Sequence, residues 1–359
     1  MSDNEINRHF KTAVLNSHAY HVPDSTGLIK LDAMENPYQL TDDFKQQWQS
    51  ELVNAELNRY PDADMSSMRE TIKQSFSVSA DCGLIFGNGS DELIQIVLMA
   101  INRGSVMSPA PSFVMYQHLA TLLEHEFIAV PLTDDFSLDL PELLEKIETI
   151  QPSIIFLAWP NNPTGVAYKK SDIEQIIKKS TGLVIVDEAY HAFANETMLN
   201  DIKHYPNLLV MRTLSKLGLA GLRLGFLVGQ TDIIEQLEKV RMPYNVGTLN
   251  QLSVSFICRH IEVLTTQTEK IKQDRAVLFQ QLSEMDAIHP IPSATNFILF
   301  KVSGLSADHV HQQLIENKIL IKNLSKAHPS LTDCLRVTVG TEEENTMFIN
   351  ALKLIFNHA

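Results

Sequence analysis

Lys216 is the residue whose type and position most directly suggest chemistry. It lies just after residues 208–211, an apolar run that predicts a buried strand, and it is flanked by Thr213, Ser215 and Arg223. A lysine in this place is either a side chain that reaches out to solvent or a desolvated amine that acts as a nucleophile, because burial lowers its pKa. The stretch by itself leaves both interpretations open.

A second candidate site lies where a predicted strand, residues 83–86, meets Gly87-Asn88-Gly89-Ser90-Asp91-Glu92. A predicted helix with apolar positions from 93 to 100 follows. A strand, a glycine turn and a helix N-terminus together direct free N–H groups and the positive end of the helix dipole at one spot, which suits an anion. The alternative is an ordinary helix start capped by Ser90 or Asp91.

Strands and helices alternate through most of the chain, which is typical of a doubly wound, mostly parallel α/β sheet. Two helices, 41–56 and 66–76, precede this pattern. From about residue 250 we expect one long helical segment to about 285 and then a smaller α+β domain. Capping boxes are expected at Ser171 with Glu174 and at Thr341 with Glu344. The predicted organisation is an N-terminal arm (1–40) packing with the small domain, a large domain (41–249) and a small C-terminal domain (250–359).

Polar residues concentrate at the carboxyl ends of the predicted strands, the edge of an open α/β sheet at which ligands bind. They are Ser90, Asp91, Tyr116, Asn162, Asp187, Tyr190, Thr213, Ser215, Lys216 and Arg223. Together they offer an anion cradle, an aromatic platform, a buried carboxylate and an amine. Pyridoxal 5′-phosphate (PLP) requires this combination: its aldehyde reacts with a lysine, its ring nitrogen pairs with a carboxylate, and its phosphate binds a helix N-terminus, hydroxyls and an arginine.

The order of these motifs resembles that of the fold-type I PLP-dependent aminotransferases over nearly the whole chain. The motifs are Pro160-Asn161-Asn162-Pro163-Thr164-Gly165, Asp187-Glu188-Ala189-Tyr190, and Ser215-Lys216 with Arg223. Further segments are similar to those of the histidinol-phosphate aminotransferase family in the class II subgroup. These segments are Asp32-Ala33-Met34-Glu35-Asn36-Pro37-Tyr38, Arg59-Tyr60-Pro61-Asp62, Met115-Tyr116, Arg212-Thr213-Leu214-Ser215-Lys216, Pro243-Tyr244-Asn245, and residues 335–341 with Glu343-Glu344-Asn345.

The resemblance implies a role for each matching residue near the cofactor ring. Lys216 would form a Schiff base with PLP and then move a proton as general base and acid. Asp187 would keep the ring nitrogen protonated. Tyr190 and Asn162 would bond the phenolic oxygen, and Tyr116 would stack on the ring.

The resemblance also implies phosphate, subunit and substrate contacts. The phosphate of PLP would bind the N–H groups of Ser90 and Asp91 together with Thr213, Ser215 and Arg223. Tyr60 would reach the cofactor phosphate of the neighbouring subunit, which implies a homodimer. Substrate would bind to Tyr20, Asn36 and Arg336, with Lys322 secondary.

Two positions depart from the pattern of the family. Arg223 follows Lys216 by seven residues, one fewer than is common, so we expect a different turn that still brings Arg223 to the phosphate. Lys322 stands where a second arginine for the substrate phosphate is frequent. A lysine lacks the bidentate fork of arginine, so Arg336 should carry more of the anion recognition.

The implied reaction is the ping-pong transamination between histidinol phosphate with 2-oxoglutarate and imidazole-acetol phosphate with glutamate. Three alternatives stay open: an aminotransferase for aromatic or other amino acids, a PLP-dependent decarboxylase of a phosphorylated amino acid, and a non-catalytic binding or regulatory protein of this fold. Retention of Lys216, Asp187 and Asn162 argues against the last of these.

Composition limits the partners. The 359 residues carry a formal net charge of −14 and show no basic stripe, which disfavours nucleic-acid and acidic-membrane binding. Three widely spaced cysteines match neither a disulfide framework nor a metal site. No targeting segment or apolar run of membrane-spanning length is apparent. We therefore expect a cytoplasmic enzyme of small-molecule substrates, without a metal.

Overall fold

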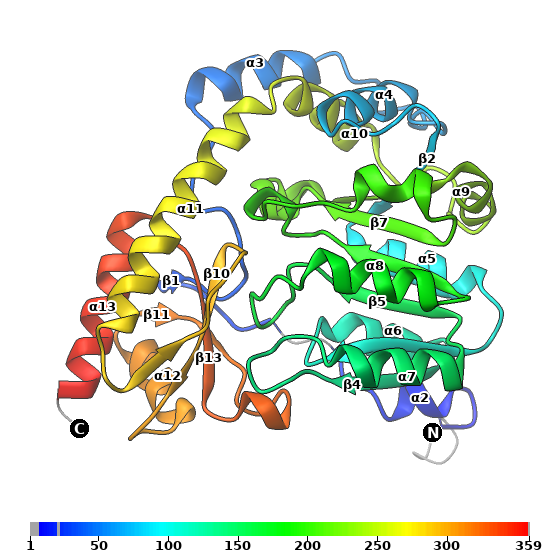
Figure 1. Ribbon diagram of the computed structural model, residues 1–359. Helices are drawn as coiled ribbons and strands as arrows, with labels where there is room; N and C mark the ends of the chain where they lie inside the picture. Colours follow the sequence, from blue (N-terminus) through cyan, green and yellow to red (C-terminus); the bar gives the residue numbers. More distant parts are fainter. Residues whose placement is uncertain (1–6, 20–21, 358–359) are drawn as a thin grey trace.

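The structure is a computed structural model that describes residues 7–19 and 22–357 (Figure 1). Tyr20, expected at the substrate site, lies outside the described residues. Two sheets organise the chain, one in the part coloured cyan to green and one in the part coloured orange to red in Figure 1.

The large sheet has seven strands. In spatial order they are β2 (Cys82–Asn88), β8 (Leu224–Gln230), β7 (Leu208–Thr213), β6 (Leu183–Asp187), β5 (Ile154–Ala158), β3 (Ser105–Ala110) and β4 (Glu126–Pro131). Neighbouring strands run parallel from β7 to β4, and β8 runs antiparallel to both β2 and β7. The expected α/β fold with a mostly parallel sheet is confirmed.

Alternation of side chains along each strand separates two hydrophobic cores. On β5, Ile155 and Leu157 face one core, whereas Ile154 and Phe156 face the other. The first core also contains residues of α3 (Asp42–Leu52), α4 (Ser66–Ser75), α7 (Leu140–Ile150), α8 (Lys170–Lys179) and α10 (Thr248–Arg259). The second contains residues of α5 (Ser90–Ala100), α6 (Val114–Leu122) and α9 (Thr231–Glu238). Helices therefore cover both faces of the sheet.

The second sheet is antiparallel, with the order β12 (Lys322–Asn323), β13 (Cys334–Thr338), β10 (Phe297–Val302) and β9 (Ile288–Pro290). Its core is shared with α11 (Glu262–Ser283), α12 (Ala307–Glu316) and α13 (Glu342–Asn357). Near the N-terminus, β1 (Ile29–Lys30) pairs in parallel with β11 (Ile319–Leu320). The boundaries of the predicted arm and two domains stay a prediction. The remaining short helices are α2 (Thr12–Leu15), η1 (His191–Phe193), η2 (Leu199–His204), η3 (Ser215–Leu217), η4 (Ala220–Leu222) and η5 (Pro329–Leu331).

Some local predictions were wrong. The long helix expected from 250 to 285 is two helices, because α10 packs against α3 and α4 whereas α11 turns away to pack on the small sheet (Figure 1). The capping box at Ser171 is absent, since α8 begins two residues earlier than that box requires, with Lys169 as N-cap and no side-chain cap. The box at Thr341 is confirmed: the N–H of Glu344 donates to Thr341 Oγ1 at 3.3 Å, and the N–H of Thr341 donates to Glu344 Oε2 at 2.8 Å.

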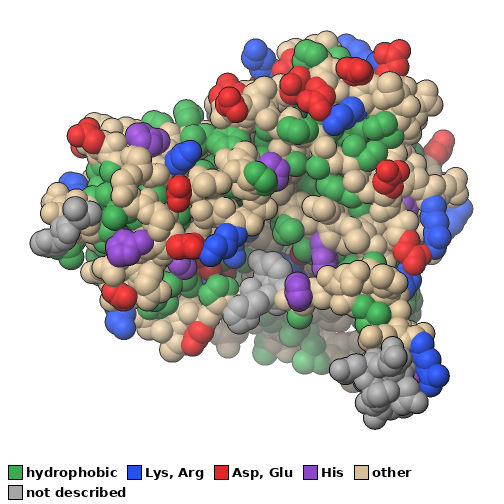
Figure 2. Space-filling model, turned by 90° about the horizontal axis from the view of Figure 1, so that it is seen from below, with side chains coloured by type: hydrophobic (Ala, Val, Ile, Leu, Met, Phe, Trp, Pro, Cys, Tyr) green, Lys and Arg blue, Asp and Glu red, His purple; other side chains and the backbone are tan. Residues whose placement is uncertain are grey.

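Acidic and basic side chains are interspersed on the face seen in Figure 2. In the described part of the chain, no helix has both the length and the apolar character needed to cross a membrane. Among the same residues, no three His, Cys, Asp or Glu side chains form a group that could hold a metal ion.

Candidate active site

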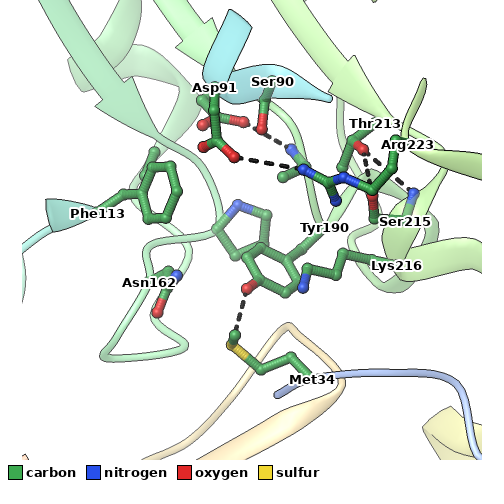
Figure 3. Close-up of a pocket in the computed structure, with 14 residues that line it drawn as sticks. Met34, Ser90, Asp91, Phe113, Asn162, Tyr190, Thr213, Ser215, Lys216 and Arg223 are labelled. Atoms are coloured by element: carbon green, nitrogen blue, oxygen red, sulfur yellow. Dashed lines mark hydrogen bonds and ion pairs between the residues drawn. The ribbon is translucent and has the colours of Figure 1, made fainter. Parts of the chain in front are cut away.

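A cavity lies at the carboxyl ends of β5, β6 and β7. It gathers residues from six separate stretches of the chain, as Figure 3 shows. The lining residues are Met34, Ser90, Asp91, Phe113, Ala158, Pro160, Asn162, Asp187, Ala189, Tyr190, Thr213, Ser215, Lys216 and Arg223. The structure thus brings together most of the polar residues that the sequence places at this edge of the sheet.

Lys216 lies on η3, directly after β7, and its amine points into the cavity (Figure 3). Its Nζ donates to the carbonyl of Ala33 at 3.3 Å. Burial, followed by the positive charge of Arg336, lowers the pKa of Lys216 to about 8. Of the two interpretations left open, the structure therefore favours the desolvated amine over the lysine that reaches solvent.

Asp187 is the last residue of β6, and only 4% of its surface is exposed. Its Oδ2 accepts a hydrogen bond from the hydroxyl of Tyr116 at 2.6 Å, and its Oδ1 accepts one from the N–H of Ala189 at 3.0 Å. Burial raises the pKa of Asp187 to about 6, although both hydrogen bonds act to lower it. The carboxylate is therefore held ready, near neutral pH, to pair with a cationic group.

The opposite end of the cavity is built for an anion. Helix α5 begins at Ser90, with Gly89 as N-cap and no side-chain cap, so its first N–H groups are left for a ligand. The guanidinium of Arg223 lies 3.5 Å from Asp91 Oδ2. Across from it, the N–H of Ser215 donates to Thr213 Oγ1 at 3.1 Å. The open helix N-terminus is thus favoured over the ordinary side-chain cap.

Two glycines keep this end open. Gly89 has φ +81°, and a Cβ there would lie 2.7 Å from Arg223 Nη2. A Cβ on Gly225 would lie 2.8 Å from the backbone nitrogen of Ser90. Gly89 therefore allows the left-handed turn beside Arg223, and Gly225 allows β8 to approach the N-terminus of α5.

Tyr116 does not take the place expected for it. Its side chain is 0% exposed, bonds Asp187 and stacks on Phe156 beneath the cavity. Phe113, at the N-cap of α6, lines the cavity instead (Figure 3). Tyr116 therefore does not line the cavity, and the ring that does is Phe113. The available signal was that Phe113 closely follows β3, whereas Tyr116 lies a turn further along α6.

Met34 was also missed from the sequence. It lines the cavity, and its sulfur accepts a hydrogen bond from the hydroxyl of Tyr190 at 3.1 Å (Figure 3). Its backbone is left-handed, with φ 55°. No feature of the sequence beyond the surrounding motif marks this residue.

Comparison with known proteins gives the family. Residues 26–352 match the family described as aminotransferase class I and II. The chain belongs to this aminotransferase family. The resemblance inferred from the motifs is therefore confirmed.

Individual relatives of this aminotransferase share most of its length. Histidinol-phosphate aminotransferase 2 of Nitrosococcus oceani is 47% identical over 337 residues, which cover 93% of this chain and 94% of that protein. Histidinol-phosphate aminotransferase of Vesicomyosocius okutanii is 41% identical over 98% of this chain and 99% of its own. The crystal structure of histidinol-phosphate aminotransferase from Sinorhizobium meliloti in complex with pyridoxal-5′-phosphate has the same fold, with a TM-score of 0.85, 20% identity and 98% of each chain covered.

A second cavity of the aminotransferase shares Met34, Phe113 and Asn162 with the first. Its cationic walls are Arg336 on β13 and Lys322 on β12, which are paired residues in the antiparallel register. The cavity that holds Lys216 therefore opens toward two cations contributed by the small sheet.

Two further predicted residues, Asn36 and Tyr60, are not among the residues that line these cavities. The amide of Asn36 donates to Leu217 O at 3.0 Å and to Gln267 Oε1 at 2.9 Å. It thus holds the loop after Lys216, and its substrate contact stays a prediction. Tyr60 is 80% exposed and stacks on Tyr244 with a centroid distance of 4.6 Å. Tyr20 is not among the described residues.

The shortened loop between Lys216 and Arg223 forms two 3-10 turns, η3 and η4. Gly218 between them has φ +124°, and Arg223 itself is left-handed with φ 46°. These positive φ values reverse the chain within seven residues. The guanidinium of Arg223 consequently lines the same cavity as the amine of Lys216.

Proposed function

We propose that this aminotransferase binds PLP in the first cavity and interconverts histidinol phosphate and 2-oxoglutarate with imidazole-acetol phosphate and glutamate, a step of histidine biosynthesis. The observation that carries the proposal is that the amine of Lys216, the carboxylate of Asp187 and the N-terminus of α5 converge on one cavity. The named relatives that share more than nine-tenths of the chain support the substrate.

The donor set fits PLP. When bound, PLP supplies an electron sink that stabilises a carbanion at the substrate Cα. Lys216 would attach its aldehyde, and Asp187 would pair with its ring nitrogen. Asn162 and Tyr190 would bond its phenolic oxygen, and Phe113 would stack on its ring. Its phosphate would bind to the N–H groups of Ser90 and Asp91 and to Thr213, Ser215 and Arg223.

Lys216 would serve as the base and the acid of the reaction. Its Nζ accepts the proton released from the substrate Cα and later returns a proton. A pKa of about 8 leaves both protonation states populated near neutral pH, which is the condition for efficient transfer in both directions.

Substrate anions would bind to the cations of the second cavity. Arg336 can hold a carboxylate or a phosphate through two parallel N–H donors, whereas Lys322 offers a point charge. Arg336 would thus serve glutamate and the phosphate substrate in turn, as ping-pong exchange requires. Tyr20 and Asn36 would complete the substrate contacts.

We further propose a homodimer in which Tyr60 reaches the phosphate end of the partner's cavity. Its exposed ring, together with exposed Val53, Leu57 and Met242, presents apolar surface from the segments around α3 and before α10. Such a surface is suited to burial against a second copy of the chain. Buried free thiols at Cys82, Cys258 and Cys334 support a reducing, cytoplasmic location.

Steady-state assays of the PLP-loaded enzyme test the substrate. Histidinol phosphate, phenylalanine and aspartate are compared as amino donors with 2-oxoglutarate as acceptor. We expect the highest kcat/KM for histidinol phosphate. A preference for phenylalanine or aspartate would reject the substrate, and release of carbon dioxide from a phosphorylated amino acid without a keto acid would identify a decarboxylase instead.

A further inference from the structure

We propose that Tyr116 is a positioning residue for Asp187. The hydroxyl of Tyr116 holds the buried carboxylate of Asp187 in its ionised form and in one orientation at the cofactor site. The proposal rests on the proposed function, because the ionised carboxylate is useful when a cationic ring nitrogen faces it. It gives Tyr116 a part in the reaction without contact to cofactor or substrate.

The contact itself is short and enclosed. The hydroxyl of Tyr116 donates to Asp187 Oδ2 at 2.6 Å, and both side chains are buried. A distance between 2.5 and 2.7 Å is typical of a hydroxyl that donates to an ionised oxygen. Away from bulk water, such a bond is stronger than the same pair would be at the surface.

The ring of Tyr116 is itself held in place. It stacks on Phe156 of β5, with centroids 4.6 Å apart and an interplanar angle of 8°. Phe113 meets it edge-on, with centroids 5.5 Å apart and an angle of 85°. Because the ring is fully buried and packed against two other rings, its hydroxyl is directed at Asp187. The first turn of α6 therefore delivers one aromatic ring to the cavity and a second to the carboxylate beneath it.

The surroundings of Asp187 otherwise disfavour a charge. Burial has the largest effect, and the negative charges of Asp91 on α5 and Glu188 in the following turn act in the same direction. The hydroxyl of Tyr116 and the N–H of Ala189 act against them. Tyr190, the other titratable group beside the carboxylate, has its pKa raised and stays neutral. Removing the hydroxyl of Tyr116 would therefore raise the pKa of Asp187 further and shift the carboxyl group toward its protonated form, which pairs less well with a protonated ring nitrogen.

A purely structural role for Tyr116 makes a different prediction. If the ring only fills the core between Phe156 and Phe113, the substitution Tyr116→Phe keeps that packing and has no pH-dependent effect. Tyr168 provides a matched control: it is buried, and among the described residues its hydroxyl has no hydrogen-bond partner. Tyr168→Phe therefore removes a buried hydroxyl without disturbing a carboxylate.

The first measurement uses the apoprotein, so that its outcome does not depend on the cofactor. The thermal unfolding midpoint is followed from pH 5 to pH 8 in the wild type, Y116F and Y168F. Because the pKa of Asp187 is raised from its unfolded value to about 6, the contribution of Asp187 to stability falls as pH rises toward and through about 6. Y116F raises that pKa further. The thermal unfolding midpoint of Y116F should therefore lie further below that of the wild type at pH 8 than at pH 5. When Y116F is combined with D187N and compared with D187N alone, the difference in unfolding midpoint should no longer depend on pH.

The second measurement is PLP binding to the apoproteins, followed by absorbance, together with kcat and KM of the loaded enzymes. Y116F should weaken PLP binding on the order of tenfold, the effect of one hydrogen bond to a charged group, and should lower kcat more than it raises KM. Y168F should match the wild type. If Y116F behaves like Y168F in both experiments, the positioning role is overturned. If instead the wild type fails to bind PLP, the proposed function fails, while the apoprotein titration still reports whether Tyr116 and Asp187 are coupled.

Discussion

Arg336 on β13 donates a hydrogen bond of 2.6 Å to Asn162 Oδ1, in the loop that follows β5. This bond joins the antiparallel small sheet to the carboxyl edge of the large one. Asn162 lines both cavities, so the residue expected to recognise the substrate anion is tied to one expected to contact the cofactor. A second bond, from Arg336 Nη2 to the carbonyl of Asp32 at 3.2 Å, links the same arginine to the N-terminal segment.

Arg336→Lys should weaken both half-reactions. The charge is kept but the two parallel donors are lost, so kcat/KM should fall by about 100-fold for glutamate and for histidinol phosphate alike. Lys322→Ala is the comparison variant, and it should lower kcat/KM mainly for histidinol phosphate. Steady-state kinetics with each donor measure both. If Arg336→Lys leaves kcat/KM for glutamate unchanged, Arg336 does not bind the glutamate carboxylate and the substrate phosphate in turn.

PLP uptake by the apoprotein should accelerate as pH rises through about 8. Lys216 has its pKa lowered to about 8, mainly by burial. Below that pH the amine is protonated and cannot attack an aldehyde, whereas above it the amine is neutral and nucleophilic. Stopped-flow absorbance between pH 6 and pH 10 measures the rate, with Lys216→Arg as the variant in which no band should form. A rate that is still rising steeply at pH 10 would mean a lysine with an unperturbed pKa.

Glu188→Ala should destabilise the apoprotein strongly. Glu188 lies behind the site, where its Oε2 accepts from Arg212 Nη2 at 2.8 Å and its Oε1 from the N–H of Met198 at 2.6 Å. Both ends of the ion pair are buried. Removal of the carboxylate therefore leaves the buried charge of Arg212 without its partner and lowers the free energy of unfolding by about 3–5 kcal/mol.

Urea unfolding measures this cost. The control for Glu188→Ala is Arg103→Ala, which breaks an exposed ion pair with Glu124 and should cost about 0–1 kcal/mol. Equal, small losses in the free energy of unfolding for the two variants would show that the buried pair is not a structural support of the site.

Tyr60 can be tested by subunit mixing. Lys216→Ala and Tyr60→Ala should each form homodimers of greatly reduced activity. In a mixed dimer, the subunit with intact Lys216 receives Tyr60 from its partner, so one of the two sites is complete. Refolding the variants together should therefore restore activity, up to half that of the wild type per mixed dimer. If the refolded mixture is no more active than the separate variants, Tyr60 does not contribute to the site of the partner subunit.

The strand ends were the most predictable part of the site. Asp187 and Lys216 each follow a run of apolar residues, and parallel strands bring such ends to one edge. Tyr116 and Phe113 were harder to separate, because the two rings lie three residues apart at the start of α6 and their directions depend on how β3 leads into that helix. The one available signal was that Phe113 lies closer to the end of β3. The break between α10 and α11 carries no proline or glycine. It follows from packing against different partners, the helices α3 and α4 for α10 and the small sheet for α11, a tertiary effect that local preferences do not contain.

The most direct test of the proposed function is a single half-reaction. The PLP-loaded enzyme is mixed with excess histidinol phosphate in the absence of any keto acid, and products are quantified together with the cofactor absorbance. We predict one equivalent of imidazole-acetol phosphate per subunit, loss of the cofactor's visible band, and recovery of that band with one equivalent of glutamate when 2-oxoglutarate is added. Failure to form the keto phosphate, with an unchanged band, would contradict the proposed function.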